Sequence, residues 1–242
     1  TWPVSGTVGT NFYFHLDGSL RENPPTGETS PTAYIHDPAD PVPTVGGTDS
    51  WIGWNEESQE RIYGMSDGAY DQRDPIDGTP LSLRRDVVTF QTPPLEEAVE
   101  MVGPITVTLY ASSSAVNTDF TAKLVDVYPP SSDWPSGFDF LVADGILRTT
   151  HRSGPKPTSL EAMEPGQQYT FTIEVPPSGN RFEVGHRIRV DIASSNFPRF
   201  DVNPGTMDGP WQRRKYIKAE NKIYHDSQRP SHIVLPVITH RQ

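Results

Sequence analysis

Alternation of apolar and polar residues is the feature of this sequence that most restricts its fold. The clearest case lies at residues 169–175, where Tyr169, Phe171 and Ile173 alternate with threonines. Successive side chains of a β-strand point to opposite faces of the sheet, so this segment is predicted to be a strand with one buried face. Similar alternation, or a short apolar run, marks about eight strands in all, at residues 12–16, 87–90, 105–109, 120–127, 146–150, 169–175, 188–192 and 233–238.

Composition and spacing narrow the fold class to an all-β protein. The 242 residues include 25 Pro and 19 Gly, which end regular elements and favour short strands joined by many turns. The spacing of the strands and turns is typical of two packed antiparallel sheets with long loops. In the segment 120–127 the alternation slips at Val125 and Val127, which indicates a bulge or a strand buried on both faces. With no internal repeat or domain boundary in sight, a single domain is predicted over residues 1–242.

A long irregular segment, at about residues 21–80, interrupts the strand pattern. A structureless stretch of this length is unusual in a compact domain, and its two tryptophans favour an ordered loop packed on another surface. We define Trp51, Ile52 and Trp54 as the aromatic cluster of this segment. From the residues alone, the cluster could cover one end of the sandwich or contact a neighbouring domain or a ligand.

Charge and cysteine content exclude several classes of protein. The chain has no Cys, which excludes disulfides, thiolate metal sites and a cysteine nucleophile. Its formal net charge of −11 argues against nucleic acid or an anionic membrane as the partner. No apolar run approaches the roughly 18 residues of a membrane helix. No signal peptide is visible, and because the chain starts at Thr1 without Met, we expect a processed or excised piece of a longer protein. The compartment is left open.

Residues 64–68 match the G-x-S-x-G pattern of a nucleophile elbow, with Ser66 at its centre. That motif requires a buried strand that turns sharply into a helix, so that the serine is exposed above an α/β sheet. The preceding residues 56–63 are polar and irregular, and Pro75 would stop a following helix. Ser66 is therefore predicted not to be a nucleophile.

Candidate metal ligands are present, but their pattern favours ordinary roles. The seven histidines are scattered, and no pair has the helical spacing of a metal site. Five aspartates crowd one loop region, at Asp37, Asp40, Asp71, Asp74 and Asp77. Such a loop could bind a structural calcium ion through its carboxylates, but three of these aspartates precede Pro, which favours turn formation. We therefore predict no metal and no cofactor.

Several strings of this sequence together resemble one family. They are DPADPVPTVGG (37–47), DQRD (71–74), TDFTAKLVDVYP (118–129), ADGILR (143–148), GHRIRVDIASSNFPRFDVNPGT (185–206) and PSHIVLPVI (230–238). Their order and spacing resemble the C-terminal non-catalytic domain of the cocaine esterase and X-prolyl dipeptidyl-peptidase (CocE/NonD) serine hydrolases. That family includes glutaryl-7-aminocephalosporanic acid acylases and α-amino-acid ester hydrolases.

The resemblance implies a jelly-roll β-sandwich of the galactose-binding-like kind. Complete family members also have an α/β-hydrolase domain with a Ser-Asp-His triad and a helical cap, which are absent here, so no catalytic residue carries over. We accordingly expect four polar residues of the string 185–206 to make structural hydrogen bonds rather than a triad: His186, Ser194, Ser195 and Asp201. In the family, the segment after the GG of residues 46–47 approaches the active-site cleft, which makes the aromatic cluster of Trp51, Ile52 and Trp54 a candidate pocket or interface.

The function implied is that of an accessory domain of a serine hydrolase, which shapes the cleft and stabilises the catalytic domain. Its partners would be the hydrolase and cap domains of the parent protein. Two alternatives stay open. One is a carbohydrate- or ligand-binding module with Trp51, Trp54, Trp134 and Trp211 as stacking platforms. The other is a structural role in a homo-oligomer.

Overall fold

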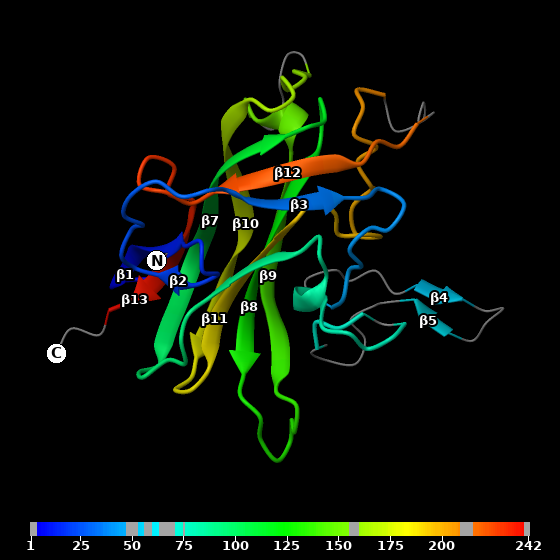
Figure 1. Ribbon diagram of the computed structural model, residues 1–242. Coiled ribbons are helices and arrows are strands. Elements are labelled where there is room, and N and C mark those ends of the chain that lie inside the picture. Colours follow the sequence, from blue (N-terminus) through cyan, green and yellow to red (C-terminus); the bar gives the residue numbers. More distant parts are fainter. Residues whose placement is uncertain are drawn as a thin grey trace.

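The computed structural model is a sandwich of two antiparallel β-sheets (Figure 1). It describes residues 4–46, 71–74, 76–154, 160–208 and 215–239, and the backbone of residues 53–55 and 60–62. The strands are β1 (Thr7–Phe14), β2 (Leu20–Arg21), β3 (Thr32–His36), β4 (Gly53–Asn55), β5 (Glu60–Ile62), β6 (Val88–Gln91), β7 (Val99–Ser113), β8 (Asp119–Tyr128), β9 (Phe138–Arg148), β10 (Gln168–Phe182), β11 (Arg187–Ala193), β12 (Ala219–Tyr224) and β13 (His232–Ile238).

The strands are ordered in a way that mixes distant parts of the chain. The seven-stranded sheet runs β2-β1-β13-β7-β12-β3, and β10 pairs with β7. The four-stranded sheet runs β6-β11-β8-β9, and β4 and β5 form a separate hairpin. Two short 3-10 helices, η1 (Leu81–Leu83) and η2 (Thr149–His151), complete the described elements. No helix among the described residues is long and apolar enough to cross a membrane. The predicted all-β jelly-roll class is confirmed.

The alternation that predicts a strand at residues 169–175 is seen in β10. Phe171 and Ile173 are buried in the core, whereas Thr172 and Glu174 are exposed on the opposite face. The ladder between β10 and β7 continues past Val175 through a register shift. The alternation therefore locates the strand correctly but ends before the strand does.

β8 shows both of the features offered above for the break in alternation at Val125 and Val127, namely a register shift and burial of both faces. Its register with β9 shifts between Leu124 and Val125. Residues 119–126 are also all buried, because one face packs on the core and the other is covered by loops. The polar residues of β8 are consequently as inaccessible as its apolar ones.

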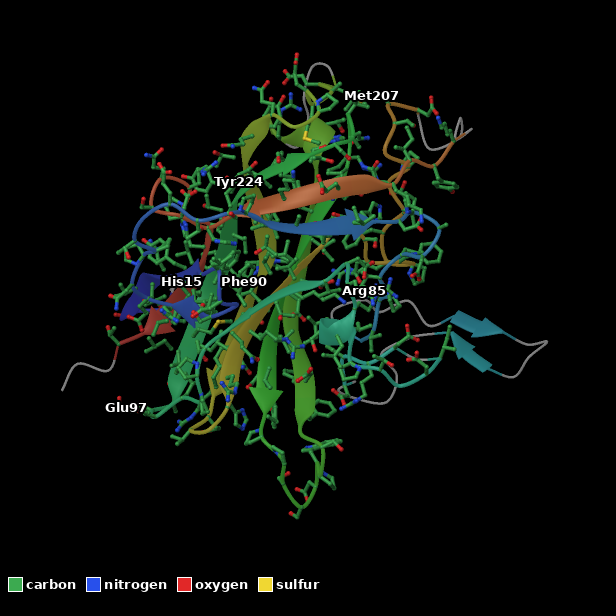
Figure 2. The ribbon with its side chains drawn as sticks, in the orientation of Figure 1. His15, Arg85, Phe90, Glu97, Met207 and Tyr224 are labelled. Atoms are coloured by element: carbon green, nitrogen blue, oxygen red, sulfur yellow. The ribbon has the colours of Figure 1, made fainter. Side chains whose placement is uncertain are left out.

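The core lies between the two sheets and is rich in phenylalanine. Phe14 of β1 stacks on Phe90 of β6 with 4.3 Å between ring centroids, and Phe120 of β8 lies 5.1 Å from Phe171 of β10. Figure 2 labels Phe90 in the body of the sandwich and Glu97 at its periphery. Each such buried ring contributes about 1.5–3 kcal/mol of hydrophobic stabilisation.

The region predicted as a long loop, about residues 21–80, contains a core strand. β3 pairs with β12 at one edge of the seven-stranded sheet. The prediction missed β3 because Tyr34 and His36 are buried while the apolar Ile35 points to solvent, so apolar residues occupy both faces. An edge strand with one solvated face tolerates such a pattern, and alternation does not reveal it.

His36, the last residue of β3, is buried to 1% exposure. Burial lowers the pKa of its imidazole below the ordinary value of 6.5, and the Asn203 backbone and the carboxylates of Asp119, Asp86 and Asp37 offset only part of that shift. Burial also lowers the pKa of His225. Below pH 6.5 the unfolded chain therefore binds protons at these positions that the folded chain does not, so acid favours unfolding.

We expect the free energy of unfolding to fall as the pH is lowered from about 7 to about 5, by up to about 1.4 kcal/mol per pH unit for each such proton. A His36→Phe variant keeps the ring shape but removes one of these protons, so its slope should be shallower by up to one proton. Urea unfolding at a series of pH values measures both slopes. An unchanged slope in the variant would refute the assignment to His36.

Candidate functional site

The outer face of the four-stranded sheet is both charged and buried. On β11, Ile188, Val190 and Ile192 face the core, so Arg189 and Asp191 point the other way. Arg189 and Asp191 are each only 4% exposed, and Lys123 of β8, on the same face, is 5% exposed. Burying charges is costly unless they are paired and hydrogen-bonded. This face must therefore be covered by a structure that supplies partners.

The charged pair at the centre of this face is well connected. The Arg189 Nε and Nη2 donate to the two oxygens of Asp191 at 2.9 and 3.2 Å. Its Nη1 donates to Asp139 of β9 at 2.7 Å. Burial alone would lower the pKa of Arg189, but the two carboxylates outweigh it and raise that pKa. Arg189 is therefore a permanent cation that joins β11 to β9.

Lys123 is less well satisfied. Burial lowers the pKa of its ammonium, and the nearby Asp144 and Asp191 oppose the shift. Its hydrogen bond is to the side-chain oxygen of Gln72, at a long 3.4 Å. The Gln72 side-chain amide donates in turn to the Val45 carbonyl at 2.7 Å. One glutamine thus connects the sheet to both ends of the segment between residues 46 and 71.

Other loop residues complete the cover over this face. The Val42 N–H donates to the Ser195 hydroxyl at 2.9 Å, and the Thr44 N–H donates to the Phe197 carbonyl at 2.7 Å. On the other side, Asp71 accepts from the Asp139 N–H at 2.9 Å. The charged face with its loop cover, which we name the anchoring layer, consists of Val42, Val45, Asp71, Gln72, Lys123, Asp139, Asp144, Arg189, Asp191 and Ser195.

The aromatic cluster of the sequence analysis falls largely outside the described residues. Trp51 and Ile52 are outside the described residues, and of Trp54 only the backbone, in β4, is described. Its assignment as a pocket or interface stays a prediction. Ser66 also lies outside the described residues. What the structure defines is how the two ends of this segment are held.

Three of the five loop aspartates act in turns, whereas Asp40 pairs with Arg84 and Asp71 pairs with Arg73. Asp37, Asp74 and Asp77 each accept a hydrogen bond from the backbone N–H two residues later, at 2.8 to 3.0 Å. Such turns are the usual role of aspartate in loops. Among the described residues, no three His, Asp or Glu side chains are grouped so that they could hold a metal ion.

The serines and histidine of residues 185–206 belong to separate hydrogen-bond networks. His186 pairs with Asp126 at 2.8 Å, whereas the Ser194 hydroxyl lies 2.7 Å from the Tyr34 hydroxyl and accepts from Asn221 at 2.8 Å. Ser195 accepts from the Val42 backbone. Within the described part of the chain, no serine hydrogen-bonds to a histidine, so these residues do not form a triad.

A second cluster was missed by the sequence reasoning. Arg148 donates to both oxygens of Asp119, at 2.9 and 3.0 Å, and to Asp201 at 3.1 Å. Asn203 also donates to Asp119, at 2.7 Å. These four residues come from three of the strings used above to identify the family. The recurrence of charged and amide residues in those strings was the available signal, but nothing in the strings indicates which residues pair.

The comparisons with known proteins identify the family. Residues 1–234 match the model of the X-Pro dipeptidyl-peptidase C-terminal non-catalytic domain, and the chain belongs to this family. Cocaine esterase of Rhodococcus sp. (strain MB1 Bresler) is 38% identical over 250 residues, which cover 98% of this chain and 39% of the esterase.

Solved structures agree with that assignment. An α-amino acid ester hydrolase superposes with a TM-score of 0.76 at 31% identity, over 95% of this chain and 36% of its own. An aminopeptidase from a marine sediment Thaumarchaeota archaeon gives a TM-score of 0.80 at 25% identity, over 99% of this chain and 38% of its own. The chain thus spans less than two-fifths of the length of these relatives and corresponds to the non-catalytic C-terminal domain of CocE/NonD-type hydrolases.

Proposed function

We propose that this domain is an accessory domain of a serine hydrolase that acts on acyl esters or amides, and that it positions residues 47–70 at the cleft of the catalytic domain. The parent chemistry would be acyl transfer through a serine of that other domain, with no catalytic group supplied here. The observation that carries the proposal is the double attachment of Gln72, which follows this segment and bonds both to Val45, just before the segment, and to Lys123 of β8.

The physical basis is preorganisation. A loop that contacts a substrate contributes more affinity if it is already ordered before binding, because ordering it during binding costs conformational entropy. The anchoring layer lies on a rigid sheet, and its charges resist rearrangement because any separation would leave a buried ion unpaired. The same attachment would let the domain stabilise the catalytic domain through the surface that the segment provides.

The test is a Gln72→Ala variant of the full-length hydrolase that carries this domain. We expect kcat/KM for a small chromogenic ester to fall by about ten-fold, a loss of about 1.4 kcal/mol of transition-state stabilisation. Reaction of the catalytic serine with a phosphonate probe should persist, because the nucleophile is elsewhere. Gln228→Ala is the matched control, since Gln228 is exposed in a turn, and it should leave kcat/KM unchanged.

Two results would contradict the proposal. Equal kcat/KM for Gln72→Ala and wild type would show that the anchored segment does not influence the cleft. Ester turnover by the 242-residue chain alone, lost on Ser66→Ala, would show that the domain carries its own nucleophile.

A further inference from the structure

A cavity of about 600 Å³ lies at the edges of the two sheets, where β9 and β10 meet. Its lining includes Ile146 and Arg148 of β9, Thr172 and Glu174 of β10, and Phe200 of the loop after β11. The volume falls within the roughly 300–1,000 Å³ of small-molecule sites. None of its lining residues belongs to the anchoring layer, and no activity discussed above uses this cavity.

The two arginines of the lining already have carboxylate partners. Arg148 donates two hydrogen bonds to Asp119 and one to Asp201. Arg152 pairs with Glu161 at 3.1 Å and also donates to three backbone carbonyls. Neither guanidinium is therefore left over to offset a further negative charge of the lining.

Glu174 carries the negative charge that these pairs leave over. Its side chain is exposed on β10 and makes no hydrogen bond or ion pair with any described residue. Thr172 projects from the same face of the strand, because the intervening Ile173 is buried in the core. With Glu161 included, four carboxylates lie at the cavity against two guanidinium groups. The net charge of the chain, −11, adds to this excess, so the cavity favours a cation.

The other lining residues restrict the kind of cation. Among the described residues, no three His, Asp or Glu side chains are grouped as metal ligands, and one unpaired carboxylate is too few for a metal ion. Ile146, Leu147 and Phe200 supply apolar surface in the same cavity. An ammonium group on an aliphatic stem matches both properties. Its charged head forms charge-assisted hydrogen bonds to a carboxylate, and its stem packs on apolar side chains.

We propose that this cavity binds a primary ammonium group on an aliphatic stem, which belongs either to a free alkylamine or to a lysine side chain of a partner. Glu174 pairs with the ammonium, and the Thr172 hydroxyl accepts a second of its hydrogen bonds. Ile146 and Phe200 pack on the stem. The proposal is independent of the cleft-positioning function, because none of these residues holds the ends of segment 47–70.

Calorimetric titration of the 242-residue chain with cadaverine, at about pH 8 and low salt, tests the proposal. At this pH an ordinary histidine is neutral whereas an alkylamine is charged. Cadaverine should bind, and added salt should weaken the binding because it screens a partly exposed ion pair. The diol of the same chain length, which has no charge, should not bind. An N-acetyl-lysine amide is titrated in parallel: tighter binding of this amide than of cadaverine assigns the site to a lysine side chain, and the reverse order assigns it to a free amine.

The contact with Glu174 is tested by a matched pair of variants. Glu174→Gln should weaken cadaverine binding about five-fold, the upper end of the effect of an exposed ion pair, and the exposure of this side chain means that the variant should fold. Glu22→Gln removes the same charge from the chain, but the exposed Glu22 follows β2, at an edge of the seven-stranded sheet. It should bind cadaverine as wild type does. The pair separates a local contact from general attraction to an acidic protein.

Three results would overturn the assignment: no amine binding at concentrations up to tens of millimolar, equal binding of the uncharged diol, or a Glu174→Gln variant that binds no more weakly than Glu22→Gln. Backbone amide signals of Thr172 and Glu174 in NMR titrations provide the second readout. They should move on addition of the amine that binds and stay in place on addition of the diol.

Discussion

Replacement of Asp119 by Ala is expected to lower the free energy of unfolding by about 3–5 kcal/mol, which is the usual cost of removing one partner from a buried ion pair. The Asp119 side chain is 2% exposed, and it accepts two hydrogen bonds from Arg148 and one from Asn203. Its loss leaves the Arg148 Nε without an acceptor, and the buried Asn203 amide keeps only its bond to Asn117, at 3.1 Å. The loop after β11 would also lose the bond from Asn203 that attaches it to β8.

Asp201→Ala is the matched control for this prediction. Asp201 accepts from the same arginine, at 3.1 Å, but its side chain is 49% exposed. An exposed pair of this kind contributes about 0–1 kcal/mol because water competes for both ions. Urea unfolding of the two variants gives the comparison. If the two losses of stability were equal, burial would not be the reason for the effect, and the explanation given for Asp119 would be wrong.

Gly145→Ala is expected to destabilise the domain by about 3 kcal/mol or more, at or beyond the upper end of the usual cost of overpacking. A Cβ atom at Gly145, in β9, would lie 2.5 Å from the carbonyl oxygen of Glu174 in β10. The obstacle is backbone, so no side-chain rotation relieves it. β9 and β10, the edges of the two sheets, would have to separate.

Gly179→Ala provides the control within β10. There the nearest atom to an added Cβ is a Val102 side-chain carbon at 3.5 Å, an ordinary contact distance. We expect a change within about 0.5 kcal/mol for this variant. Thermal and urea unfolding of both variants measure the difference. A Gly145→Ala variant as stable as wild type would mean that the two sheet edges can move apart freely.

The strands that alternation predicts are those whose two faces differ. β10 and β11 were located from sequence because one face packs on the core and the other carries polar residues. β12 was missed because Asn221 is buried on its inner face, where the pattern expects an apolar residue. The side-chain amide nitrogen of Asn221 donates hydrogen bonds to Ser194 and Thr118, and these partners are far away in the sequence.

The anchoring layer could not be predicted for a related reason. Arg189 and Asp191 look like the solvated face of a strand, and only the loop that covers them makes them buried. Gln72 gives no local sign that it bonds to Val45 and Lys123. The family resemblance indicated that the surrounding strings matter, and the structure supplies their physical role as partners in buried polar networks.

The pairing of charges in the anchoring layer has an evolutionary consequence. Lys123 and Arg189 face Asp139, Asp144 and Asp191, and Arg199 also pairs with Asp144. A single neutral substitution would leave the partner's charge buried and unpaired, in surroundings that solvate it poorly. Replacing both partners by apolar residues would leave no unpaired charge. Neighbouring positions of this kind are energetically coupled. In descendants of this chain, the layer should therefore be inherited as a set, with substitutions arising in compensating pairs.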